Sequence, residues 1–178
     1  STIFNDLNFS TINTFLNNGI KTNFEFFLKN VNTLGKNSSK YKASPQSELM
    51  SAYTYNASLP MTKKTSRSFN TFEPKLSLRL SPHDMKNNRA IERRIDINNI
   101  FNPNRLSMDD SFEGGESITL GLNFKKEKIN IINNLREIED YIDFKLASVL
   151  RLNPEVNIPI NSTLNKKKSN IFGQLNFK

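Results

Sequence analysis

The 178-residue chain contains no cysteine and no tryptophan, only one histidine, and no long apolar run. Without cysteine it can form neither a disulfide framework nor a thiolate metal site, and its redox compartment cannot be assigned. A membrane-spanning helix needs about 18 consecutive apolar residues, which the sequence nowhere approaches. The first residues, Ser-Thr-Ile-Phe, carry neither a basic nor an apolar leader region. We therefore expect the sequence to be a piece of a longer protein.

Apolar residues are also scarce, since hydrophobic side chains make up 36% of the chain and its mean hydropathy is −0.55. This composition is poor material for a large water-excluding core and is typical of a polar β protein. The net charge of +8 would attract nucleic-acid phosphates, anionic lipids and lipid phosphates alike. Charge alone therefore does not identify the partner.

What the sequence does have is a period of two. Apolar or small residues alternate with polar ones in six clear blocks and one weaker block, the pattern of strands with two different faces. The clear blocks span residues 20–28, 49–61, 72–80, 118–124, 142–152 and 171–177, and the weaker block spans 7–16. The pattern predicts about seven strands.

The segments between the blocks are polar and carry turn formers. Asn17-Asn18-Gly19 is a favoured hairpin connection, and we expect polar joins at residues 62–68 and 125–139. A single helical candidate, residues 129–141, overlaps the second of these connections.

Strand length and charge placement distinguish a membrane barrel from a soluble sandwich. Several blocks run to nine or more residues, whereas strands of globular proteins usually have about 5–6 and tilted membrane strands about 9–11. The apolar face of the clear blocks carries no charged residue, although 24% of the chain is charged. We therefore predict an all-β fold, an antiparallel transmembrane β-barrel segment. The segment spans residues 1–178 and forms about seven strands of a larger outer-membrane barrel. An odd strand count with open edges requires further strands, because backbone groups in lipid must all be paired.

The face opposite the apolar one is rich in basic residues and should line an aqueous lumen. Lysine and arginine there could hold the phosphates and acidic sugars of a glycolipid while its acyl chains stay near hydrocarbon. The candidates are Lys21, Lys29, Lys75, Arg79, Lys145 and Arg151. For any single one, a solvated or acid-paired lumen side chain is an equally good interpretation.

A long loop is expected at residues 82–114, between the third and fourth clear blocks. The sequence of this loop and of the strands that flank it resembles the barrel of the LPS-assembly protein family LptD, also called OstA or Imp. The flanking strands contain Phe72-Glu-Pro-Lys-Leu-Ser-Leu-Arg-Leu-Ser-Pro82 before the loop and Leu120-Gly-Leu122 after it. The resemblance spans residues 72–178 and is strongest in one ordered set in the loop. That set comprises Asn104, Arg105, Asp110, Glu113, Gly114 and Gly115.

The loop set also admits an interpretation from its residue types alone. Asp110 and Arg105 could form a structural pair, and Gly114-Gly115 could supply positive-φ turn geometry. The chain departs from the family pattern at Leu106, Met108 and Ser111, and the paired cysteines of some members are absent. We therefore expect the loop to have an architectural role.

The resemblance implies an outer-membrane translocon component that assembles lipopolysaccharide into the outer leaflet. It further implies a lipoprotein plug of the LptE kind and periplasmic Lpt bridge proteins as partners, with lipopolysaccharide and outer-membrane lipid in contact with the barrel. No periplasmic jellyroll domain is recognisable in these residues. No enzymatic activity, metal or cofactor is implied.

Three other functions share part of these sequence features. A general porin or TonB-type uptake barrel shares every physical feature except the loop resemblance. A hydrolase would need His83, whose neighbours Ser81 and Asp84 have poor expected geometry, and Asp109, Asp110 and Glu113 do not match a calcium loop. A nucleic-acid binder should interleave aromatic and basic residues on one face. Because these segregate here, we expect no nucleic-acid partner.

Overall fold

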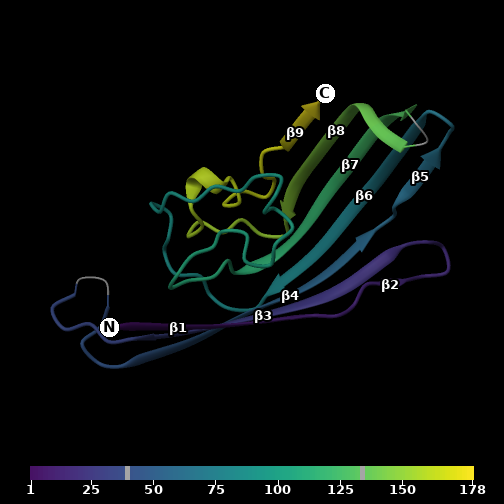
Figure 1. The fold of residues 1–178 in the computed structure, drawn as a ribbon. Helices are drawn as coiled ribbons and strands as arrows, with labels where there is room; N and C mark the ends of the chain where they lie inside the picture. Colours follow the sequence, from purple (N-terminus) through teal and green to yellow (C-terminus); the bar gives the residue numbers. More distant parts are fainter. Residues whose placement is uncertain (39–40, 133–134) are drawn as a thin grey trace.

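The computed structural model describes residues 1–38, 41–132 and 135–178 as one antiparallel β-sheet with long connections at one end (Figure 1). Within these ranges the only helical element is a single 3-10 turn, Ile160–Ser162, and no helix is long and apolar enough to cross a membrane. The strands are β1 (Thr2–Ser10), β2 (Thr14–Phe15), β3 (Lys21–Thr33), β4 (Gln46–Ser58), β5 (Met61–Lys64), β6 (Ser68–Ser81), β7 (Gly115–Ile132), β8 (Leu135–Arg151) and β9 (Phe172–Phe177).

The nine segments occupy seven positions in the sheet. The order is β1-β3-β4-β6-β7-β8-β9, with β2 also paired to β3 and β5 also paired to β6. The sheet is not closed, since β1 and β9 are its two edges. The prediction of an all-β antiparallel barrel segment of about seven strands is confirmed.

Two of the expected joins are strands, and the helical prediction is wrong. Residues 129–132 and 135–141 belong to β7 and β8, whose pairing continues to Ile132↔Leu135, while residues 133–134 lie outside the described part. The expected join at 62–68 contains β5, which pairs with β6. Both segments are polar, but the hydrogen bonds between paired strands come from the backbone and do not require apolar side chains.

The two faces of the sheet have opposite surroundings. Leu78 and Leu120 on the apolar face are 42% and 48% exposed, and Phe177 near the end of β9 is 75% exposed. On the other face, Thr119 is 2% exposed. Charged and small polar side chains at the ends of β6, β7 and β8 are therefore covered, while a broad band of large apolar side chains is open.

The cover on the polar face consists of the two longest connections, residues 82–114 and 152–171, which we call the plug. They lie side by side, because the Asn88 amide donates to the Asn157 carbonyl at 2.9 Å and the Ile160 amide to the Arg89 carbonyl at 3.3 Å (Figure 1). Apolar plug residues pack with residues of β8 in one core cluster, made of Met85, Ile95, Ile100, Leu106, Met108, Ala147, Val149, Ile158 and Leu164. The main core thus lies between the plug and the β-sheet, which we call the wall.

The connections differ in length at the two ends of the sheet. Residues 34–45, 82–114 and 152–171 join strands at the plug end, while residues 16–20 and 65–67 make short turns at the other. Gly19, at φ 81°, takes the positive-φ position in the first short turn, as predicted for Asn17-Asn18-Gly19. Long loops on one side and short turns on the other are typical of outer-membrane barrels.

A charge placed on the open apolar face tests whether that face meets hydrocarbon. We expect Leu120→Arg in the full-length protein to lose about 2–4 kcal/mol of unfolding free energy in phospholipid vesicles, because arginine is costly near the bilayer midplane. Guanidinium titration of the vesicle-inserted protein measures this. Asn123→Arg on the opposite face is the control and should cost little. Equal stability of Leu120→Arg and the parent protein would contradict a lipid-facing surface.

Candidate functional site

The site forms where three neighbouring strands end beneath the plug. Antiparallel register places Arg79 of β6, Ser117 of β7 and Arg151 of β8 in one row. Residues opposite each other in such a ladder point to the same face, so both guanidinium groups face the plug. Glu113 comes directly before Gly114 and β7, so its carboxylate is delivered to the same level of the wall.

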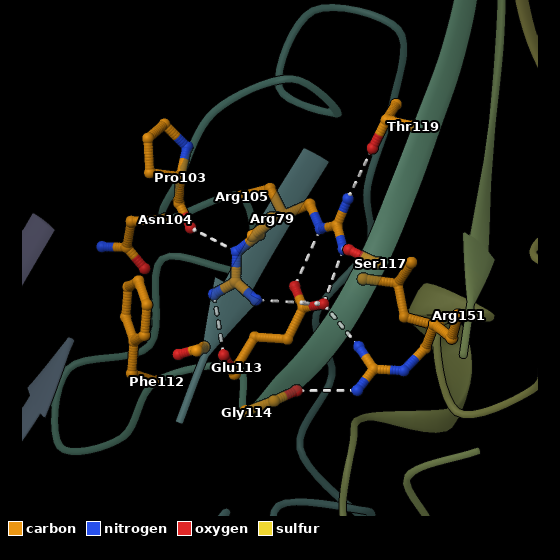
Figure 2. A network of polar contacts seen from close by, with 12 residues as sticks. Arg79, Pro103, Asn104, Arg105, Phe112, Glu113, Gly114, Ser117, Thr119 and Arg151 are labelled. Carbon is orange, nitrogen blue, oxygen red and sulfur yellow. Dashed lines mark hydrogen bonds and ion pairs between the residues drawn. The ribbon is translucent and has the colours of Figure 1, made fainter. Parts of the chain in front are cut away.

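Glu113 is the centre of a network of three arginines (Figure 2). Arg105 donates from Nε to Oε2 at 2.8 Å and from Nη2 to Oε1 at 2.6 Å, a two-point contact. Arg151 donates from Nη1 to Oε1 at 2.7 Å, and Arg79 Nη1 lies 3.7 Å from the same oxygen. We call these four residues the Glu113 network.

The remaining guanidinium donors bind backbone and hydroxyl oxygens. Arg79 donates to the carbonyls of Glu113 and Pro103 at 2.7 and 3.2 Å, and Arg151 donates to that of Gly114 at 2.7 Å. Arg105 also reaches two hydroxyls of β7, on Ser117 at 3.0 Å and Thr119 at 3.1 Å. The network thus joins the plug to three strands of the wall.

An aromatic stack extends the network towards β3. The Arg79 guanidinium lies 5.1 Å from the centre of the Phe112 ring, within the range of a cation–π interaction. Phe112 is fully buried and stacks on Phe27 of β3, with centroids 4.9 Å apart and ring planes 8° from parallel. The residue before Glu113 therefore anchors the plug to a fourth strand.

All four members of the network are buried, at 5% exposure or less. Burial by itself would raise the pKa of the Glu113 carboxyl. The charges of Arg105, Arg79 and Arg151, with the hydrogen bonds from Arg105, outweigh that effect and lower this pKa from 4.5 to about 2. Glu113 is therefore ionised at neutral pH, and its negative charge is surrounded by three positive ones.

The two glycines after Glu113 leave no room for side chains. A Cβ on Gly114 would lie 2.6 Å from the His83 carbonyl oxygen, and one on Gly115 would lie 2.6 Å from Arg151 Nη2. Gly115 also has φ of 87°, which side-chain-bearing residues rarely adopt. Glycine at these positions lets the arginine reach Glu113.

The rest of the loop set has structural partners. Arg105 is paired with Glu113 and not, as considered from the sequence, with Asp110, which accepts a hydrogen bond from the Tyr41 hydroxyl at 2.9 Å. The Asn104 carbonyl accepts from the Ser107 amide in a turn. Leu106 and Met108, which depart from the family pattern, are core residues, and buried Ser111 accepts from Asn88 at 2.7 Å.

Three of the lysines expected to line the lumen have acidic neighbours. Lys29 is buried against Asp6 at 3.1 Å and donates to the Asp109 carbonyl of the plug at 3.2 Å. Lys75 lies 3.4 Å from Glu73, and Lys145 lies 3.8 Å from Asp143. Only Lys29 of these three is fully buried.

Lys21 and Lys75 share an open pocket of about 160 Å³ on the polar face. Its other contributors include the ring of Phe101 from the plug and the side chains of Asn23, Asn56 and Glu73. The six predicted basic residues therefore fall into two groups. Members of the first group are buried and join the wall to the plug, and members of the second group are partly exposed on the polar face. Lys29, Arg79 and Arg151 form the first group, and Lys21, Lys75 and Lys145 form the second.

The single histidine lies just beyond the last residue of β6 and contacts Ser81, with Ser81 Oγ and His83 Nδ1 3.1 Å apart. The Ser81 hydroxyl is almost fully buried and donates to the Ser51 carbonyl at 2.5 Å, while His83 Nε2 lies 3.1 Å from the Phe112 carbonyl oxygen. The Ser81–Ser51 contact joins β6 to β4, the His83–Phe112 contact lies within the plug, and the Ser81–His83 contact ties the plug to β6.

A cation cluster at Asp109, Asp110 and Glu113 also gains no support, since Glu113 is bound to arginine. Within the described residues there is no group of three His, Cys, Asp or Glu side chains able to hold a metal ion.

Sequence reasoning missed Phe112, Ser117 and Thr119 as members of the site. The hydroxyls sit on the polar face of a strand, where their alternation with Ile118 was visible but their role was not. Arg79 and Arg151 each lie near the end of a strand that flanks β7, and both are opposite Ser117 near the start of β7. This common position, close to Glu113 in the chain, is the signal that could have linked them to Glu113.

Most of the chain matches a known protein family. The family model LptD, described as LPS transport system D, matches residues 16–178. No curated protein and no solved structure matches significantly. The match includes the whole plug and all members of the Glu113 network, and it extends well before the region in which the sequence resemblance was recognised.

Removing the charge of Glu113 should loosen the plug. We expect Glu113→Gln to cost about 3–5 kcal/mol of unfolding free energy, because three buried guanidinium groups lose their counter-charge. Guanidinium titration measures the loss, and protease cleavage within residues 82–114 should become faster. Glu92→Gln, an exposed change in the same connection, should alter stability by less than about 0.5 kcal/mol. Equal effects of the two variants would contradict the role of the network.

The same network predicts how stability depends on acid. Because the folded-state pKa of Glu113 is about 2 and its ordinary value is 4.5, the unfolded chain binds more protons between these values. The contribution of Glu113 is therefore fully present above about pH 4.5 and lost as pH falls towards 2. Unfolding titrations from pH 6 to 2 should show a steeper fall for the parent protein than for Glu113→Gln. Parallel curves would show that Glu113 is not the responsible group.

Proposed function

Since the chain belongs to the LptD family of lipopolysaccharide transport proteins, we propose that it forms part of an outer-membrane translocon that assembles lipopolysaccharide into the outer leaflet. Transport of lipopolysaccharide follows from the family. The delivery step and the contribution of individual residues are the parts proposed here.

The observation that supports this function best is the inverted sheet, in which the apolar face is open and the charged face is covered by the plug. A water-soluble protein would gain by burying that apolar face, whereas a wall between lipid and an aqueous lumen must expose it. An amphipathic substrate fits such a wall. Its acyl chains match the outer face, and its phosphates and sugars match a basic interior.

The division of the basic residues assigns roles within this function. We infer that Arg79, Arg151 and Lys29 hold the plug in place, because their charges already contact Glu113, Asp6 and plug carbonyls. Lys21, Lys75 and Lys145 are partly exposed on the same face and are left to meet the glycolipid head group. An LptE-like lipoprotein and periplasmic Lpt bridge proteins are the partners proposed with it.

Depletion of the full-length protein in its host tests the function directly. We expect newly made lipopolysaccharide, followed by pulse labelling, to accumulate in the periplasm, because its route to the outer leaflet is removed. Re-expression of the parent protein should restore delivery. A general porin or TonB-type barrel predicts the opposite combination, with normal surface lipopolysaccharide after depletion and free ion conductance by the purified protein in planar bilayers.

A further inference from the structure

We propose that the pocket between Lys21, Lys75 and Phe101 is a binding site for a phosphorylated sugar. The proposal rests on the function above and names the part of the substrate that the pocket would hold. The pocket lies on the polar face, outside the Glu113 network.

Strand register places the two lysines on either side of one small residue. Lys21 of β3 pairs with Ser58 of β4, and Ser58 pairs with Lys75 of β6, so the three residues form one row. Neighbouring strands lie about 4.8 Å apart, which places the two lysine backbones roughly 10 Å from each other with the small Ser58 between them. Long side chains from either side can converge on a single phosphate over that serine.

The charge balance of the pocket favours an anion. Its lining has two lysines and one carboxylate, that of Glu73, which lies 3.4 Å from Lys75 Nζ. Lys21 forms no ion pair within the part of the chain that the structure describes. A phosphate would therefore meet one cation without a competing acid and a second that is shared.

The plug supplies a flat apolar surface beside these charges. Phe101 packs on Gly121 of β7, where a Cβ would come within 2.5 Å of the ring, and Lys75 Nζ lies 5.9 Å from the ring centre. The absence of a side chain at position 121 lets the ring lie close to the wall. Its remaining surface borders the pocket, where a sugar ring can stack on it.

Side-chain amides complete the lining. Asn23 and Asn56 are a register pair one row nearer the plug end, and the Asn56 Oδ1 atom is buried with no hydrogen-bond partner. An acceptor without a partner is a suitable contact for a sugar hydroxyl. The volume of about 160 Å³ lies well below the roughly 300–1,000 Å³ of pockets for drug-sized ligands. The pocket thus fits one sugar unit with its phosphate.

Equilibrium binding to the full-length protein in detergent tests the site, with glucosamine 1-phosphate as the probe and saturation-transfer NMR as the readout. We expect binding of glucosamine 1-phosphate and much weaker binding of glucosamine. The double variant Lys21→Gln/Lys75→Gln should raise the Kd at least tenfold. Phe101→Leu should weaken binding of glucosamine 1-phosphate but not of inorganic phosphate, because only the sugar uses the ring.

Lys64→Gln is the matched control, because Lys64 is an exposed lysine of β5 on the same face of the sheet but outside the pocket. It should leave the Kd unchanged. Heat-modifiable migration on gels confirms that each variant retains its barrel. An unchanged Kd in the folded double variant, or equal binding of glucosamine with and without phosphate, would overturn the proposal.

A second measurement separates a lipid head group from a free sugar phosphate. With the photoreactive residue p-benzoylphenylalanine in place of Phe101, irradiation of living cells should give a crosslink to lipopolysaccharide. A crosslink only to small sugar phosphates would reject the lipid source. If depletion blocks lipopolysaccharide delivery but the pocket binds no sugar phosphate, the site is wrong and the function stands. If the pocket binds the sugar phosphate but delivery is normal after depletion, the proposed function is wrong and the binding site stands.

Discussion

The arrangement of the plug depends on one buried carboxylate. Glu113 neutralises part of the charge of three arginines that come from the plug and from two strands, and the same guanidinium groups bind the plug backbone. The connection could not lie against the wall without this anion, because uncompensated buried charges are costly. The apolar core beneath the plug and the pocket beside Phe101 both follow from that attachment.

The sheet reverses the usual relation between polarity and burial. In a water-soluble β-sandwich the apolar faces meet and the polar ones are solvated, but here the polar face carries the core and the apolar face is open. This arrangement explains how a chain with only 36% hydrophobic residues can fold. Its large apolar side chains are divided between a lipid-facing band and a small set in the plug.

Positive charge serves two purposes in this lumen. Near the plug end, the arginines are buried and form several hydrogen bonds each, because the planar guanidinium group carries five N–H donors. Outside the Glu113 network, Lys21, Lys75 and Lys145 remain partly exposed on flexible stems. By position, the net charge of +8 divides into buried groups that hold the plug and partly exposed lysines, and the lysines are the part that we propose meets the ligand.

The antiparallel sheet, its two faces and the long loop can be predicted from the residues alone, because a period of two is a local property of each strand. The sequence also indicates the family and the glycine turn, since these depend on residues close together in the chain. Three features could not be predicted in this way: Arg105 pairs with Glu113, residues 129–132 and 135–141 are strand, and Phe101 lies beside Lys75. These outcomes depend on register between strands and on how the plug folds back, which join residues far apart in the chain and leave no local pattern.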